Sequence, residues 1–176
     1  MSYKNKNIAV VIPYYNAAKH IVSVVQKLPD YIDGIIIVND NSPDELPEDL
    51  IKAYKNINTK IFILNCEVNL GVGGATKKGF QFAVDNEFDV VVKVDADDQM
   101  DTSYLEEMIL PIVENKAHVS KGNRFKRTKE LKKMPFVRRI GNLGISFLAK
   151  LATGYWNNFD PTNGFLAIKT IVLKEV

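Results

Sequence analysis

Hydrophobic residues fall in short continuous runs, and these runs alternate with segments of helical periodicity. Apolar runs without polar interruption are typical of strands buried on both faces of a parallel sheet. The pattern predicts five strands, at Ile8–Pro13, Gly34–Val38, Lys60–Asn65, Asp89–Val94 and Ala117–Gly122. It predicts helices at Ala17–Leu28, Glu48–Lys55, Val72–Asn86, Ser103–Asn115 and Phe136–Thr153, the last ended by Gly154. This order indicates an α/β fold, with a Rossmann-like, mostly parallel sheet and helices on both faces.

Polar residues follow several of these strands at the point where each strand ends. They are Tyr15, Asn16, Asp40, Ser42, Asn69 and a group of aspartates that begins at Asp95. In open α/β sheets, ligands bind outside the carboxyl ends of the strands. We therefore expect a ligand site at this edge of the sheet.

Four aspartates stand within seven residues, at Asp95, Asp97, Asp98 and Asp101. Like charges this close repel one another, and a divalent cation such as Mg²⁺ or Mn²⁺ would offset the repulsion. In an extended chain, Asp95 and Asp97 point to the same side and Asp98 points away. A cation held by so few protein ligands keeps open positions, which commonly bind phosphates. The alternative is an acidic turn in which Asp101 or Thr102 caps the next helix.

Composition narrows the class of protein. A chain of 176 residues with 46% hydrophobic residues indicates one globular domain. The net charge of +2 is too small to indicate a nucleic-acid partner. The single Cys66 has no partner for an internal disulfide, and no apolar stretch is long enough to span a bilayer. Because the chain ends at Val176 without a stop signal, we expect a domain that is truncated at its C-terminus.

A basic segment occupies residues 121–139, where nine Lys and Arg residues stand against the single acid Glu130. Two interpretations are open for this segment. It is either a solvated charged loop or a surface that binds an anionic ligand opposite the acidic cluster.

The glycine-rich stretch at Gly71, Gly73 and Gly74 does not fit the common nucleotide-binding patterns. A Rossmann fingerprint follows the first strand and needs a third glycine where this chain has Thr76. No Gly-Lys-Ser/Thr sequence of the Walker type occurs. A tight turn into the following helix accounts for at least one of these glycines.

Taken in order, the motifs resemble those of the family 2 glycosyltransferases, which have the GT-A fold of nucleotide-diphospho-sugar transferases. The matching segments are IAVVIPYYN (8–16), IVNDNSPD (37–44), NLGVGGATKKGFQFA (69–83) and the Asp-x-Asp sequence at 95–97. The chain looks most similar to the dolichyl- and polyprenyl-phosphate sugar synthases. That likeness rests on DADxQ (95–99), GNR (122–124), RxxGN (138–142) and the residues Thr153, Gly154, Asp160, Thr162, Gly164 and Phe165. Two positions depart from the pattern, since Ala17 replaces a frequent Glu and Asn39 replaces the first of two aspartates.

The resemblance implies a role for each matching residue on the donor side. Pro13 and Tyr15 would flank the base and ribose, and Asp40 would accept a hydrogen bond from an imide N–H of uracil or guanine. Asp95 would lie near the ribose or sugar hydroxyls, and Asp97, with Gln99, would hold Mg²⁺ or Mn²⁺. The other residues expected to bind the nucleotide sugar are Asn16, Asn69, Gly71, Gly74, Lys78 and Ala96.

On the acceptor side, the resemblance implies that Arg124, Arg138 and Arg139 bind a lipid phosphate. If the acceptor is a sugar hydroxyl, a general base is needed and Asp160 is the candidate. The expected catalytic residues are therefore Asp97, Arg124 and Asp160. Residues 1–116 would form the nucleotide-sugar-binding half and residues 117–176 the acceptor half of a single GT-A domain.

These expectations define a leading hypothesis and three alternatives. The leading hypothesis is a metal-dependent, inverting transfer from a UDP- or GDP-linked sugar to a polyprenyl phosphate. The alternatives are transfer to a saccharide hydroxyl in cell-surface polysaccharide synthesis, a sugar-phosphate nucleotidyltransferase and a non-catalytic nucleotide-binding domain. We expect a cytoplasmic protein at the cytoplasmic face of a membrane. Any membrane association would come from a region beyond Val176 or from the predicted helix over Phe136–Leu151. His20 and His118 are read as ordinary helix and strand positions.

Overall fold

The computed structural model describes residues 3–54, 58–122, 144–147, 150–152, 154 and 163–175. The chain divides into two compact units. The main unit contains residues 1–120 and 165–176, and the second unit contains residues 121–164. The functional division into halves at residue 116 stays a prediction.

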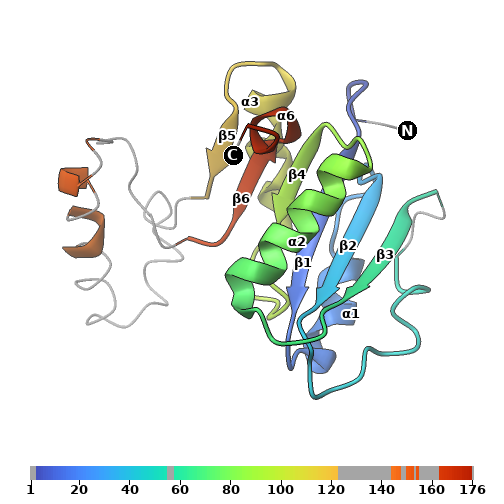
Figure 1. Ribbon diagram of the computed structural model, residues 1–176. Helices are drawn as coiled ribbons and strands as arrows, with labels where there is room; N and C mark the ends of the chain where they lie inside the picture. Colours follow the sequence, from blue (N-terminus) through green and yellow to red (C-terminus); the bar gives the residue numbers. More distant parts are fainter. Residues whose placement is uncertain are drawn as a thin grey trace. The chain divides into compact units, whose positions relative to one another are not determined.

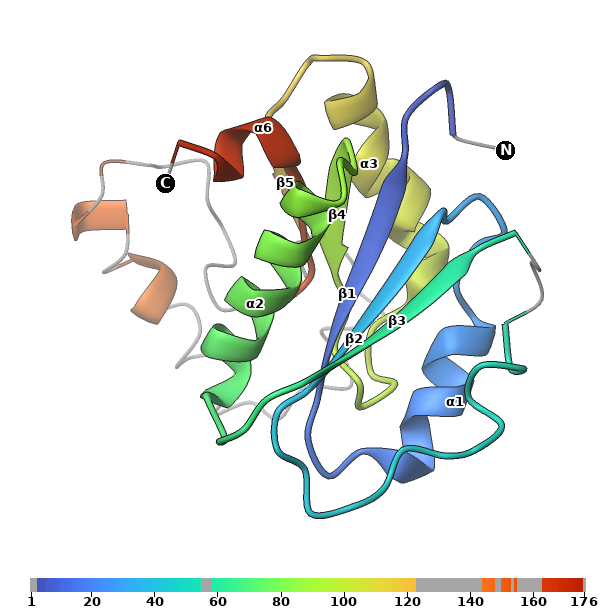
Figure 2. The same cartoon turned by 45° about the vertical axis from the view of Figure 1, so that its right-hand side comes forward.

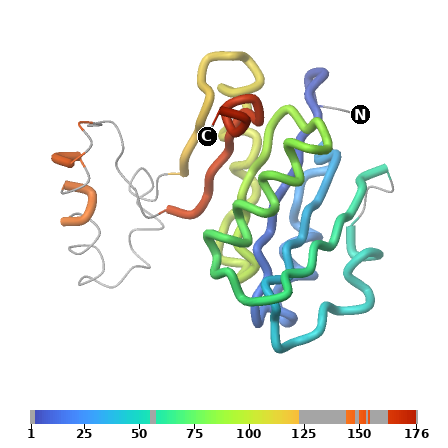
Figure 3. Tube along the Cα trace, in the orientation of Figure 1, coloured from blue at the N-terminus to red at the C-terminus, as the bar shows by residue number. Residues whose placement is uncertain are grey.

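Within the described residues, six strands form one sheet in the order β3-β2-β1-β4-β6-β5. The strands are β1 (Ile8–Tyr14), β2 (Gly34–Asn39), β3 (Lys60–Asn65), β4 (Val90–Lys93), β5 (Val119–Lys121) and β6 (Leu166–Lys169). β1 pairs in parallel with both β2 and β4, and β2 pairs in parallel with β3. β6 is antiparallel to β4, so segments far apart in sequence lie side by side (Figure 3). The predicted mostly parallel α/β sheet is confirmed.

Helices cover both faces of this sheet (Figures 1 and 2). They are α1 (Ala18–Gln26), α2 (Gly71–Asp85), α3 (Leu105–Val113), which follows the short 3₁₀ helix η1 (Thr102–Tyr104), and α6 (Thr170–Leu173). On β1, Val10 and Ile12 pack into the core beneath α1 and α3, whereas Ala9 and Val11 pack into the core beneath α2. Alternate residues of a strand point to opposite faces, so an unbroken apolar run supplies both cores. No described helix has the length and apolar character needed to cross a bilayer.

Two parts of the main unit differ from the prediction. The segment expected as a helix at Glu48–Lys55 is not helical in its described residues, 48–54, and residues 48–52 form turns. Leu50 and Tyr54 are buried, whereas Ile51 is 63% exposed. An isolated helix of two turns is marginal, and here turns bury the two anchoring side chains without it. The second difference is β6, an unpredicted strand that lies between β4 and β5.

In the second unit, residues 144–147 and 150–152 are helical, in agreement with the predicted helix. Gly154 has a φ of 71°, and its N–H donates to the carbonyl of Lys150 at 2.9 Å. A glycine with positive φ commonly ends a helix in this way. The remainder of the predicted Phe136–Thr153 helix lies outside the described residues.

Candidate active site

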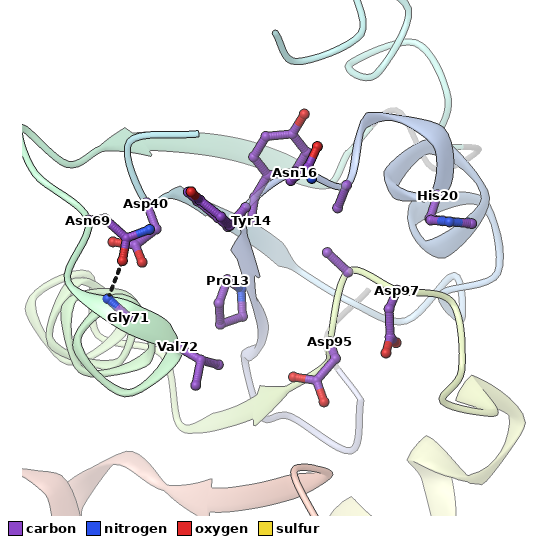
Figure 4. Close-up of a pocket in the computed structure, with 13 residues that line it drawn as sticks. Pro13, Tyr14, Asn16, His20, Asp40, Asn69, Gly71, Val72, Asp95 and Asp97 are labelled. Carbon is purple, nitrogen blue, oxygen red and sulfur yellow. Dashed lines mark hydrogen bonds between the residues drawn. The ribbon is translucent and has the colours of Figure 1, made fainter. Parts of the chain in front are cut away.

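A pocket of about 440 Å³ opens at the carboxyl ends of β1, β2 and β4 (Figure 4). It is lined by Pro13, Tyr14, Tyr15, Asn16, Ala17, His20, Asp40, Asn69, Gly71, Val72, Asp95, Ala96 and Asp97. All of these residues belong to the main unit. The pocket therefore lies where a doubly wound sheet is expected to bind its ligand.

The structure brings most of the predicted donor-side residues together around this pocket. Those in its lining are Pro13, Tyr15, Asn16, Asp40, Asn69, Gly71, Asp95, Ala96 and Asp97. In Figure 4, Asp40 and Asn69 lie on one side of Pro13, and Asp95 and Asp97 lie on the other. Amide and carboxylate side chains from separate loops therefore line the same pocket.

Three predicted residues do not line the pocket: Gly74, Lys78 and Gln99. A Cβ atom at Gly74 would lie 2.5 Å from the Cβ of Leu70, so this glycine permits close packing within the turn into α2. The Lys78 ammonium donates to the carbonyl of Asn65 at 2.7 Å. Only the first residues of α2 reach the pocket, because the helix then leads away along the sheet. Arg124, Arg138, Arg139 and Asp160 lie outside the described residues.

Four lining residues were not predicted: Tyr14, Ala17, His20 and Val72. His20 lies in the first turn of α1, as its interpretation as a helix position predicts, and it also belongs to the pocket lining. The available signal was its place one turn after Asn16, at the end of a strand that reaches the binding edge. Tyr14 is fully buried and donates to the carbonyl of Glu45 at 3.1 Å, and burial raises the pKa of its phenol.

Asp40 fixes the entry to α2. Its side chain is 3% exposed, and its Oδ1 accepts the N–H of Leu70 at 2.7 Å. The next turn is closed by Asn69, whose Oδ1 accepts the N–H of Gly71 at 2.9 Å. Gly71 has a φ of 72°, a conformation that residues with a Cβ rarely adopt. The glycine-rich stretch thus has a structural requirement at Gly71, and this residue also lines the pocket.

Asp44 ties the loop after β2 to the beginning of α1. It accepts hydrogen bonds from the Ser42 hydroxyl and from the N–H of Ala18, the second at 2.8 Å. Ser42 in turn accepts the N–H of Asn16 at 2.7 Å. Burial raises the pKa of the Asp44 carboxyl, but these hydrogen bonds outweigh burial and hold that pKa below its usual value. The side of the pocket formed by Asn16 and the start of α1 is therefore held in place by hydrogen bonds within the protein.

The four aspartates of the acidic cluster have different partners. Asp95 forms an ion pair with the buried Lys93. Asp98 turns away from the pocket and accepts from Lys27 at 2.6 Å and from Ser23 at 2.9 Å. Asp101 caps η1 by accepting the N–H of Ser103 at 3.1 Å. The alternative interpretation, in which the aspartates form a turn that caps a helix, therefore accounts for Asp101 but not for the other three aspartates.

Asp97 is the member of the cluster that stays available. It is exposed, and its Oδ1 accepts only the N–H of Gln99, at 3.1 Å, among the described residues. No described group of three His, Cys, Asp or Glu residues gathers as a complete metal site. A single free carboxylate fits a hard divalent cation whose other positions are filled by phosphate and water.

Comparisons with known proteins agree with this geometry. Residues 9–176 match the sequence profile of glycosyl transferase family 2. The chain is 36% identical to a UDP-N-acetylglucosamine–dolichyl-phosphate N-acetylglucosaminyltransferase of Methanococcus voltae, over 97% of this chain and 72% of the relative. It is 30% identical to an uncharacterized protein of Methanocaldococcus jannaschii, over 96% of this chain and 67% of the relative.

Among solved structures, the fold is similar to that of glucosyl-3-phosphoglycerate synthase from Mycobacterium tuberculosis, crystallised with Mn²⁺, UDP and glucosyl-3-phosphoglycerate. The TM-score is 0.70 at 18% identity, and the match covers 98% of this chain but only 60% of that chain. The family match covers nearly the whole chain, and the Methanococcus relative is 36% identical over 97% of it. The chain belongs to glycosyl transferase family 2, a family of glycosyltransferase enzymes, and has the GT-A fold.

Proposed function

We propose that this chain transfers a sugar from a UDP-linked donor to a polyprenyl phosphate, in a reaction that needs a divalent cation. The observation that carries the proposal is the pocket itself, where Asp40 and Pro13 face Asp95 and Asp97 across one space. Such a space suits a ligand with a base at one end and a charged diphosphate at the other.

The base would lie beside Pro13 and Tyr15 and donate its imide N–H to Asp40. A carboxylate has about four acceptor sites, so the hydrogen bond from Leu70 leaves capacity for a second donor. Uracil and guanine both offer an imide N–H. Uracil is favoured because the Methanococcus relative is named for a UDP-linked donor and the solved mycobacterial synthase holds UDP.

Asp97 would bind the cation, which is Mg²⁺ or Mn²⁺, and Asp95 would accept hydrogen bonds from ribose or sugar hydroxyls. The bound cation supplies Lewis acidity to the leaving diphosphate. Asp97 needs no further protein carboxylate for this role if diphosphate oxygens complete the coordination. Gln99 keeps only a supporting part, because its N–H orients Asp97 while its side chain lies outside the pocket lining.

The acceptor phosphate would attack the anomeric carbon directly. An oxygen of the lipid phosphate forms the new bond as the bond to the β-phosphate of UDP breaks, and the electron pair leaves with UDP. Because the phosphate is already an anion, no general base is required, and one displacement inverts the anomeric centre. Arg124, Arg138 and Arg139 are proposed to bind this phosphate, and the Methanococcus relative is named for a dolichyl-phosphate acceptor. Reaction at the cytoplasmic face of a membrane would fit such an acceptor.

The test is UDP release in the presence of UDP-N-acetylglucosamine and a short polyprenyl phosphate. With Mn²⁺ or Mg²⁺ we expect stoichiometric UDP and lipid-linked sugar, and neither product with a chelator. Omission of the lipid should reduce UDP release to the slow rate of hydrolysis. UDP release that depends on an added saccharide instead of the lipid would assign a hydroxyl acceptor and give Asp160 the role of base.

A further inference from the structure

Lys93 is a buried cation beside the pocket, in a strand whose other residues are valines. We propose that Lys93 is a positioning residue that keeps Asp95 out of the cation's coordination sphere. Asp95 then serves as a hydrogen-bond acceptor for the donor's hydroxyls, and Asp97 alone supplies a carboxylate to the cation. This inference rests on the proposed function.

The position of Lys93 in the sheet explains its partner. Lys93 is the last residue of β4, and it stands between Val11 of β1 and Leu166 of β6. Its side chain is 11% exposed, and its ammonium pairs with Oδ1 of Asp95. A buried ammonium needs a counter-charge, because its removal from water is otherwise too costly. Among the described residues, Asp95 is the only carboxylate that forms an ion pair with Lys93.

Stability alone does not account for this ion pair. The preceding residues of β4, Val90, Val91 and Val92, are buried and apolar, and an apolar residue of similar volume at position 93 would continue the same core. Replacement of a buried ion pair by apolar side chains is often neutral or stabilising. The ion pair therefore acts mainly on Asp95, which lines the pocket, whereas Lys93 does not.

That consequence is electrostatic. With Lys93 in place, the charge of Asp95 is offset and Asp97 presents close to one net negative charge to the pocket. A cation alone should then bind weakly and bind well only with the diphosphate, which brings its own oxygens. Without the lysine, two carboxylates two residues apart become available to one cation. The affinity for the cation alone should rise by about tenfold or more.

The experiment is a titration of the protein with Mn²⁺ in the absence of nucleotide. Electron paramagnetic resonance measures the concentration of free Mn²⁺ at each point. The proteins are wild type, Lys93→Met, Asp95→Asn and the double variant, with Lys93→Arg as the charge-conserving control. We expect tighter Mn²⁺ binding in Lys93→Met, no such gain when Asp95 is already Asn, and wild-type behaviour in Lys93→Arg. A double-mutant cycle of this kind isolates the interaction between the two residues.

A second readout concerns the sugar. With saturating Mn²⁺, calorimetry should show that Lys93→Met loses the affinity difference between UDP-sugar and UDP, because Asp95 no longer faces the hydroxyls. If the circular dichroism spectrum of Lys93→Met differs from that of wild type, Lys93→Gln is used instead, because it also removes the positive charge.

The outcomes separate this inference from the proposed function. Unchanged or weaker Mn²⁺ binding in the folded neutral variant overturns the role of Lys93, while Mn²⁺-dependent UDP binding by wild type would still support the proposed function. If wild type binds neither Mn²⁺ nor UDP, both are overturned.

Discussion

Asp40 has a structural role in the turn into α2 and a proposed role in binding the base. Its Oδ1 accepts the N–H of Leu70, and the carboxylate also faces the pocket beside Pro13. Substitutions can separate the two roles, because asparagine retains an acceptor oxygen for Leu70 and loses the charge, whereas alanine loses both.

Asp40→Asn should weaken Mn²⁺-dependent UDP binding by about tenfold to a hundredfold, because hydrogen bonds to a charged acceptor contribute about 1.5–3 kcal/mol. Its free energy of unfolding should change little. Asp40→Ala should also lower the free energy of unfolding, by about 1–3 kcal/mol, because it leaves the N–H of Leu70 without its partner. Calorimetry and urea denaturation measure the two effects. Wild-type UDP affinity in Asp40→Asn would remove Asp40 from base recognition.

The acidic turn after β4 is attached to α1 by Asp98, which accepts from Lys27 and Ser23. Asp98 has a φ of 60°, so the chain is turned here and not extended. The side chain nevertheless points away from Asp95 and Asp97, as expected from the sequence for an extended chain. The Lys27 hydrogen bond, supported by Ser23, outweighs burial and lowers the pKa of the Asp98 carboxyl. Asparagine tolerates the left-handed conformation as aspartate does, which makes Asp98→Asn a matched variant.

A lowered native pKa means that the ionised form of Asp98 stabilises the fold. This contribution is complete above the unfolded-state pKa of about 4 and is lost as the pH falls through the lower native value. Asp98→Asn should therefore be less stable than wild type at neutral pH, by about 1 kcal/mol since Lys27 is half exposed. The difference should shrink towards zero at about pH 2. Urea denaturation of both proteins across this range measures it, and a difference independent of pH would contradict the assignment.

The packing of α2 on the sheet depends on Gly79. A Cβ atom there would lie 2.4 Å from Cγ1 of Val11 and 3.0 Å from Cγ2 of Val38. Gly79→Ala should therefore lower the free energy of unfolding by about 1–3 kcal/mol, despite the better helix propensity of alanine. Gly73 is the matched control in the same helix, since a Cβ there meets nothing within 4 Å. Gly73→Ala should be neutral or stabilising by up to about 1 kcal/mol, and equal effects at both sites would contradict close packing at Gly79.

The strands were the most predictable elements of this molecule. The runs at β1 and β2 are apolar enough to fix each strand within about one residue, because burial on both faces requires that pattern. The run at β3 locates its strand equally well, although β3 is a partly exposed edge strand. The segment at 48–54 was not predictable, because its two buried residues fit either a helix or a series of turns. β6 was missed because a four-residue antiparallel strand carries little periodic signal, and its partner β4 is 73 residues or more away in sequence.

Across the described part of the molecule, the pocket lining was predictable where residues directly follow strands, as Asp40 and Asp95 do. Lys78 and Gly74 do not line the pocket. A motif does not show how far along α2 the pocket extends, and their predicted binding roles stay predictions. The sequence prediction also missed Lys93, because a lysine at a strand end gives no sign in sequence of being buried against Asp95.

Among the residues that the structure describes, those lining the pocket belong to the main unit, whereas Arg138 and Arg139 are proposed to bind the acceptor phosphate. The double variant Arg138→Gln, Arg139→Gln should bind Mn²⁺ and UDP as wild type does, while its KM for polyprenyl phosphate should rise by about tenfold or more. Lys126→Gln, Lys129→Gln is the control in the same basic segment, with the same loss of charge. An equal rise in KM for both pairs would indicate a general electrostatic effect instead of a phosphate site.

In the proposed function, Asp97 holds a cation that binds the diphosphate of UDP in this pocket. The most direct measurement is calorimetry of UDP and of GDP, with and without Mn²⁺, on wild type, Asp97→Asn and Asp101→Asn. The last variant is the control, because Asp101 belongs to the same cluster but caps η1 outside the pocket. We expect UDP to bind wild type and Asp101→Asn only with Mn²⁺, GDP to bind more weakly, and Asp97→Asn to lose UDP binding. Equal UDP binding without Mn²⁺, or wild-type binding in Asp97→Asn, would contradict this proposal.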